Sequence, residues 1–106
     1  MEAALRAIAE PRRRHILALV RTNELSAGDI AAQFDVTWPA ISQHLGVLKD
    51  AGLVTERRAG TRRLYRARPE GLQELRAFLE SFWDERLALL KHEAERDEAT
   101  GHAVGD

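Results

Sequence analysis

The hydrophobic positions of this chain follow two different periods, and the change of period divides the sequence. Apolar residues recur with the helical repeat of about 3.6 residues in four segments before Gly52 and again after Pro69. Between these positions, residues 53–58 and 62–67 alternate with a period near two on either side of Gly60, which predicts a β-hairpin. The pattern therefore predicts a mainly α fold in which four helices are followed by a hairpin and a final helix.

The fourth predicted helix, which begins after Thr37, has two unlike faces. Thr37 is a suitable N-cap, Pro39 falls in the first turn, and Gly52 is a left-handed stop. One face carries the apolar residues Ile41, Leu45 and Leu48, and the opposite face carries Pro39, Ser42, Gln43 and Gly46. Because the outward face lacks lysine and glutamate, it suits close contact with another surface such as a DNA groove. The alternative is a surface helix that happens to be poor in charge.

A shorter predicted helix comes just before this one. Ser26 can cap its start, with Asp29 three residues later, and its apolar positions run to Phe34. Two residues separate Phe34 from Thr37, so the two helices must turn sharply against each other, which is helix-turn-helix spacing. A hairpin directly after such a unit is a wing, and the sequence therefore predicts a winged helix-turn-helix.

Charge is distributed unevenly along the chain. The formal net charge is −1, yet residues 53–68 hold six arginines against one glutamate, and residues 84–106 hold seven acids against three basic residues. Most hairpin arginines are expected to contact phosphates, and one near the tip, such as Arg62 or Arg63, can reach a minor groove. The alternative is a solvated edge strand protected from aggregation. The arginines at 12–14 oppose the dipole of the second helix, which indicates either a negatively charged partner or solvated side chains.

The final helix is predicted to begin at Pro69, and if it is helical to about Ala99 its length is on the order of 45 Å at about 1.5 Å per residue. A domain of this size has a radius of gyration of about 13 Å, so the apolar stripe of the helix needs another subunit. We predict a homodimer formed through this helix and the N-terminal helix at residues 2–8. The residues expected at the interface are Leu5, Ile8, Phe78, Phe82, Trp83, Leu87 and Leu90. Residues 1–99 thus form one domain, and residues 100–106 are expected to be a disordered tail.

The composition excludes several classes of function. The chain has no cysteine, which excludes disulfides and thiolate metal sites and suits a cytoplasmic location. It has no apolar stretch of about 18 residues and no apolar signal core, so neither membrane insertion nor secretion is expected. It also lacks a glycine-rich phosphate loop, and its histidines are scattered without a paired carboxylate at positions 15, 44, 92 and 102. We therefore expect no enzymatic activity.

The order of the predicted elements and three motifs resembles the ArsR/SmtB family of bacterial and archaeal winged-helix repressors. The motifs are Glu10–Leu17, Pro39–Val54 and Gly60–Tyr65, and the likeness covers about residues 3–92. The resemblance implies a dimeric repressor that binds an inverted-repeat operator, with recognition helices in successive major grooves and wings alongside. It implies a groove-facing surface made of Thr37, Trp38, Pro39, Ser42 and Gln43.

Within that surface, Gln43 is the best candidate for reading adenine, because its amide can bond both N6 and N7. His44 falls near the core border, where phosphate contact or packing is expected. Together with the wing, the expected DNA-binding residues are Thr37, Trp38, Pro39, Ser42, Gln43, His44, Arg57, Arg58, Arg62 and Arg63.

The sensing sites of the family transfer incompletely to this sequence. The thiolate sites need cysteines, and a second family site needs a histidine where this chain has Arg86, so only His92 and Glu95 match. Two ligands cannot make a closed four-coordinate zinc site, and we expect neither a metal nor another cofactor. The three aromatic residues of the final helix are either dimer core or the lining of an apolar effector pocket. The sequence does not specify an effector.

The predicted function is that of a sequence-specific DNA-binding transcriptional regulator, a dimeric repressor whose partners are double-stranded DNA and a second copy of the chain. The alternative is a winged-helix module for protein association, in which the same helix and hairpin bind an acidic protein. If each helix and wing neutralises three or four phosphates, the affinity of a dimer for DNA should fall with salt at a log–log slope of about −5 to −7.

Overall fold

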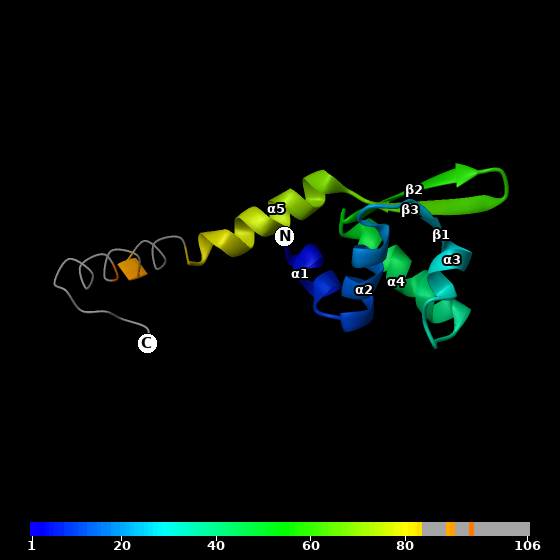
Figure 1. The fold of residues 1–106 in the computed structure, drawn as a ribbon, viewed down its shortest axis with the longest axis horizontal. Coiled ribbons are helices and arrows are strands. Elements are labelled where there is room, and N and C mark those ends of the chain that lie inside the picture. Colours follow the sequence, from blue (N-terminus) through cyan, green and yellow to red (C-terminus); the bar gives the residue numbers. More distant parts are fainter. Residues whose placement is uncertain (84–88, 91–93, 95–106) are drawn as a thin grey trace. The chain divides into compact units, whose positions relative to one another are not determined.

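The computed structural model describes residues 1–83, 89, 90 and 94. In chain order its elements are α1 (Glu2–Ile8), α2 (Pro11–Val20), β1 (Leu25–Ser26), α3 (Ala27–Ala31), α4 (Trp38–Asp50), β2 (Val54–Ala59), β3 (Arg62–Ala67) and α5 (Pro69–Ser81). The chain forms two compact units, Met1–Leu75 and a second that begins at Arg76. The element order confirms the predicted mainly α, winged helix-turn-helix fold (Figure 1).

The sheet of the first unit has one strand more than predicted. β1 pairs antiparallel with β3, with Leu25 opposite Tyr65 and Ser26 opposite Leu64, so the strand order is β1-β3-β2. A strand of two residues is too short to show alternation in the sequence, and its second residue has another role. Ser26 Oγ accepts a hydrogen bond from the Asp29 N–H at 3.0 Å and caps α3. The predicted cap is confirmed, and the predicted hairpin is joined by a third strand, β1, which the sequence did not indicate.

The wing itself is a tight hairpin. β2 and β3 pair from Val54 opposite Ala67 to Ala59 opposite Arg62, which leaves a two-residue turn. The first turn residue, Gly60, has φ +65°, the left-handed value that a type II′ hairpin turn needs at this position. The predicted glycine turn is confirmed.

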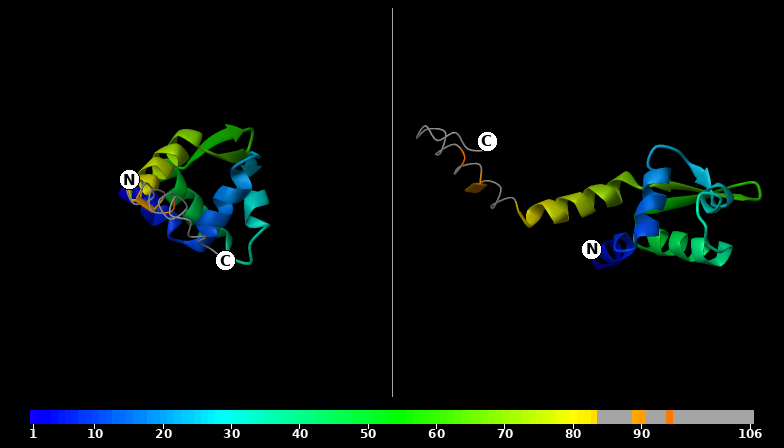
Figure 2. Two further views of the ribbon diagram at one scale, coloured as in Figure 1. Left: turned by 60° about the vertical axis from the view of Figure 1, so that its left-hand side comes forward. Right: turned by 60° about the horizontal axis from the view of Figure 1, so that its bottom comes forward.

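Helix α4 is anchored in the apolar core of the first unit. It contacts α1, α2, α3 and β2, and in Figures 1 and 2 α3 lies between the start of α4 and the hairpin. The large side chains that are completely buried in this core are Ile16, Val20, Ile30, Ile41, Leu45, Leu48 and Leu53. The helix is followed by Gly52 with φ +74°. Both the predicted core face of α4 and its left-handed stop are confirmed.

Arginines at the start of α2 bind the end of α1. Arg13 donates from Nε to the Ala7 carbonyl oxygen at 2.7 Å and from Nη2 to the Arg6 carbonyl oxygen at 3.1 Å. Arg14 donates to the Ile8 carbonyl oxygen at 2.7 Å. The last carbonyls of a helix carry partial negative charge and lack helical partners. The negative partner that these arginines indicated therefore includes a helix end of the same chain.

The first turn of α5 lies directly against the chain segment that follows α4. Gly71 is buried, and a Cβ placed on it would lie 2.0 Å from the carbonyl oxygen of Gly52. Only a residue without a side chain permits this approach of one backbone to the other. The contact fixes the start of α5 against the segment that follows α4.

The prediction of one helix from Pro69 to Ala99 is wrong. α5 ends at Ser81, and residues 82 and 83 form a turn. The Ser81 hydroxyl donates to the Phe78 carbonyl oxygen at 2.6 Å, and the Phe82 N–H bonds the Leu79 carbonyl oxygen instead of continuing the helical ladder. Because the apolar stripe continues across this turn, periodicity did not reveal the break. Residues 100–106, for which disorder was predicted, lie outside the described residues.

Candidate nucleic-acid interface

The start of α4 presents the polar surface that the sequence predicted. The Thr37 hydroxyl accepts a hydrogen bond from the Ala40 N–H at 3.3 Å and caps the helix. The residues of the predicted groove-facing surface that are exposed are Thr37, Trp38, Pro39, Ser42 and Gln43. The exposure of this face follows from the burial of the opposite face, and its contact with DNA stays a prediction.

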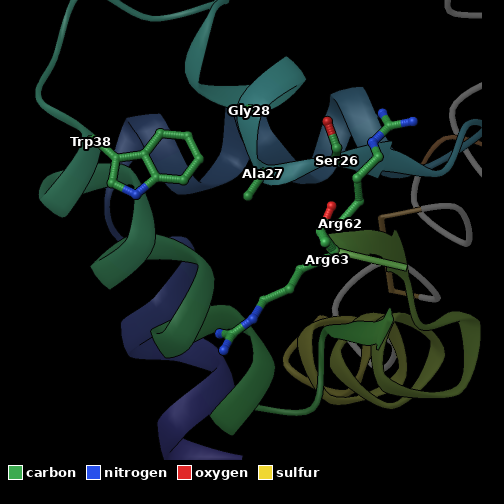
Figure 3. A pocket seen from close by; sticks show the side chains of 7 residues that line it. Ser26, Ala27, Gly28, Trp38, Arg62 and Arg63 are labelled. Carbon is green, nitrogen blue, oxygen red and sulfur yellow. The ribbon is translucent and has the colours of Figure 1, made fainter. Parts of the chain in front are cut away.

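A groove of about 410 Å³ lies between the start of α4 and the tip of the hairpin. Its lining residues are Ser26, Ala27, Gly28, Trp38, Thr61, Arg62 and Arg63. Trp38 is 55% exposed, and in Figure 3 its ring lies on the α4 side of this groove. The groove brings together parts of α4 and the hairpin that are more than twenty residues apart in the sequence.

The wing arginines divide into two pairs with different surroundings. Arg57 donates from Nε and Nη2 to the two carboxylate oxygens of Glu24, each at 2.7 Å, and Arg62 donates to Asp29 at 3.3 Å. Within the described part of the chain, no ion pair forms at Arg58 or Arg63. All four side chains are exposed.

A second polar cluster joins the base of the wing to α4. The Tyr65 hydroxyl donates to Glu56 at 2.8 Å, and Lys49 lies 3.8 Å from the same carboxylate. The hydrogen bond from Tyr65 lowers the pKa of Glu56, as do the charges of Lys49, Arg63 and Arg58, while burial raises the pKa of Tyr65. These contacts fix the hairpin beside α4.

His44 lies at the edge of the core, as predicted. Its Nδ1 is 3.3 Å from Nη1 of Arg13, the residue that also binds the end of α1. Since a guanidinium only donates, Nδ1 is the acceptor and the ring proton is on Nε2. Burial, followed by the charge of Arg13, lowers the pKa of His44. The structure shows the packing role expected for His44, and phosphate contact stays a prediction.

Acidification is expected to destabilise the fold through His44. The unfolded side chain takes up a proton near pH 6.5, whereas the folded one does so only at lower pH. The unfolded state therefore binds more protons in this window, and the free energy of unfolding decreases as the pH falls through it. Urea unfolding between pH 7.5 and 5 checks this, with His44→Gln as the comparison because glutamine can still accept from Arg13. We expect a smaller loss in the variant, and equal losses would contradict the assignment.

The residues predicted to form a dimer interface have different exposures. Leu5, Ile8 and Phe78 are half-buried. Phe82, Trp83 and Leu90 are 66%, 42% and 53% exposed, and Phe78 and Phe82 stack edge to face with centroids 5.0 Å apart. Leu87 lies outside the described residues. A role in dimerisation stays a prediction for all of them.

Two of the expectations concern metal binding and membranes. His92 and Glu95, the two possible zinc ligands, lie outside the described residues. Among the residues that are described, no group of three or more histidine or acidic side chains is placed to hold a metal ion. In the same part of the chain, every helix is too short or too polar to span a bilayer.

The amino-acid sequence matches those of known bacterial regulators. Residues 10–56 match the model of the bacterial regulatory protein, arsR family. The HTH-type transcriptional regulator Rv2034 of Mycobacterium tuberculosis is 44% identical over 86 residues, which span 81% of this chain and 80% of that protein. The chain belongs to the ArsR family. The predicted DNA-binding transcriptional regulator is confirmed at this level, and the protein-association alternative finds no support.

Another relative and two solved structures show the same likeness. The transcriptional repressor SdpR of Bacillus subtilis is 42% identical over 60 residues, 57% of this chain and 67% of the repressor. The crystal structure of a possible transcriptional regulator for arsenical resistance is 44% identical, with a TM-score of 0.73 over 85% of this chain and 94% of that one. The solution structure of the homodimeric winged helix-turn-helix DNA-binding domain Mb0332 from Mycobacterium bovis is 35% identical, with a TM-score of 0.64 over 81% and 80%.

Sequence reasoning missed the partners of the predicted site residues. Glu24 and Asp29 were not associated with the wing, and Arg13 was not associated with His44. Each of these pairs joins residues more than thirty positions apart, and the acids reach the wing only because β1 pairs with β3. No local pattern in the sequence reports such a pairing.

Proposed function

We propose that this ArsR-family protein is a homodimer that represses transcription in the cytoplasm by binding an inverted-repeat operator. The two α4 helices enter successive major grooves, and each wing follows the adjacent phosphate backbone. The observation that carries the proposal is the exposed, uncharged face of α4 lying beside the basic hairpin across one groove, with Trp38 and Arg63 on its two sides.

The proposed dimer has two supports. The related domain from Mycobacterium bovis is a homodimer. In this chain, Phe82 and Trp83 expose large apolar side chains, which monomeric proteins rarely gather at their surface. A second subunit would cover such side chains. The mass of the purified protein by light scattering tests this part directly, and a monomeric mass at micromolar concentration would contradict it.

Protection of the DNA upstream of its own gene tests the proposed function. We expect a two-fold symmetric protected site with half-site centres about one helical turn apart, unchanged by zinc or chelator. Transcription from that promoter in a reconstituted system should decrease when the protein is added. Equal affinity for the upstream DNA and for a random duplex across salt concentrations would refute sequence-specific regulation. A zinc-dependent footprint would instead assign a role to His92 and Glu95.

Gln43→Ala is expected to reduce the preference for the operator over an unrelated duplex by about 5- to 150-fold per half-site, the value of one bidentate base contact. The slope of log affinity against log salt should stay the same, because Gln43 carries no charge. Titrations of both duplexes at several salt concentrations provide both quantities. Gln73→Ala is the matched control, since Gln73 is an exposed glutamine on α5. If the variant retained its full preference for the operator, Gln43 would not contribute to base recognition.

A further inference from the structure

The two pairs of wing arginines lie on opposite faces of the sheet. Arg58 and Arg63 are directly opposed across β2 and β3, and alternation places them on the same face as the buried Val54 and Tyr65. Glu56 is on this face as well, but in the described part of the chain its ion pair is with Lys49 and not with either arginine. Arg57 and Arg62 alternate with them and lie on the other face. The sequence pattern does not distinguish the four arginines, but in the fold the two pairs have different neighbouring residues.

Figure 3 shows this division at the tip of the hairpin. The guanidinium of Arg63 extends toward α4, whereas that of Arg62 extends in the opposite direction, toward the Ser26 side. Arg63 thus lines the same groove as Trp38, the first residue of α4. Arg63 therefore extends toward the helix that the proposed function places in the major groove, and Arg62 extends away from it.

Arg57 and Arg62, on the face of the sheet opposite to Arg58 and Arg63, form ion pairs with acidic side chains. The Arg57 guanidinium makes two hydrogen bonds of 2.7 Å with the Glu24 carboxylate, the same fork geometry with which arginine binds a phosphate. The bond to Arg57 lowers the pKa of Glu24, so this carboxylate is ionised at neutral pH. Asp29 binds Arg62 through one longer contact of 3.3 Å, and the Asp29 side chain is 60% exposed against 28% for Glu24.

From this arrangement we propose that the carboxylates of Glu24 and Asp29 bind the guanidinium groups of Arg57 and Arg62 in place of DNA phosphates. The wing then binds the DNA backbone through Arg58 and Arg63. The inference rests on the proposed function. A paired arginine and carboxylate carry no net charge, so they release no counterions from DNA. A phosphate that displaced Glu24 would also leave that carboxylate unpaired beside the polyanion. Glu24 is thus a positioning residue that limits non-specific binding by the wing.

The salt dependence of binding to an unrelated duplex tests the proposal. Arg58→Ala should flatten the slope of log affinity against log salt by about 1.8 in a dimer, since each lost phosphate contact removes about 0.9 and there are two wings. Arg63→Ala should have a similar effect. The matched controls remove a paired arginine and its acid together, as E24Q/R57A and D29N/R62A, which leaves the net charge unchanged. These double variants should retain the wild-type slope.

Removing only the acid provides the opposite change. Glu24→Gln should free Arg57 for phosphate, steepen the slope by up to about 1.8 and tighten non-specific binding, with a smaller effect for Asp29→Asn. The proposal is overturned if Glu24→Gln leaves the slope unchanged, or if E24Q/R57A flattens the slope as much as Arg58→Ala. Thermal unfolding of each variant verifies that it is folded. Failure of the proposed function is distinct from these results, because it requires equal binding of operator and unrelated DNA by the wild type.

Discussion

Gly71→Ala is expected to lower the free energy of unfolding by about 3 kcal/mol, the upper end of the usual cost of overpacking, and the melting temperature by roughly 12–24 °C. The added Cβ would lie 2.0 Å from the Gly52 carbonyl oxygen and 3.0 Å from its carbon. Both are main-chain atoms that cannot rotate away, so either the first turn of α5 or the segment after α4 must move. Urea and thermal unfolding at a fixed protein concentration measure the loss, because a dimer makes both values concentration-dependent.

Gly46→Ala is the matched control for this effect. Gly46 is also helical, but a Cβ placed on it meets no atom within 4 Å. In a helix interior, alanine is favoured over glycine by about 0.5–1 kcal/mol, so this variant should be slightly more stable than the wild type. If both variants lost stability equally, the close approach of Gly71 to Gly52 would not be the cause.

Leu48→Ala is expected to cost about 2–5 kcal/mol, the range measured for leucines that leave a cavity in a well-packed core. Leu48 is completely buried on the face of α4 that contacts the other helices and the sheet. The loss should appear as a lower denaturation midpoint in urea with an unchanged dependence of unfolding free energy on urea concentration.

Val47→Ala serves as the comparison, because Val47 is the adjacent residue on the same helix and is only half-buried. We expect it to cost less than about 1.5 kcal/mol, since fewer neighbouring atoms lose contact. Equal losses at positions 47 and 48 would mean that α4 does not pack through the face assigned to it.

Local signals were sufficient to predict the elements that position the site. The caps at Ser26 and Thr37 and the left-handed Gly52 and Gly60 depend on a few neighbouring residues, and the structure has each of them in its predicted place. The buried face of α4 follows in the same way from helical spacing. Such features are visible in the sequence because short stretches of chain determine them.

The features that were missed depend on tertiary contacts. β1 is stable only because β3 lies beside it, and the partnership of Arg57 with Glu24 follows from that pairing. The contact between Gly52 and Gly71 likewise joins two segments separated by the whole wing. The end of α5 was misplaced because apolar spacing continues through its turn. The candidate surface on α4 was therefore predictable from the sequence, whereas the division of the wing arginines into two pairs was not.

The close approach of Gly71 to Gly52 also fixes the base of the wing, so the tip of the hairpin can be exchanged separately. The hairpin begins after Gly52 and ends before Gly71, and its base is part of the core through Leu53, Val54 and Tyr65. This base is closed by the Arg68 N–H, which donates to the Leu53 carbonyl oxygen at 2.8 Å. Changes of length or sequence at the Gly60 turn therefore need not displace the helices on either side. Hairpin tips from other members of the family can be grafted onto this base, which would let backbone affinity be tuned separately from the base preference of α4.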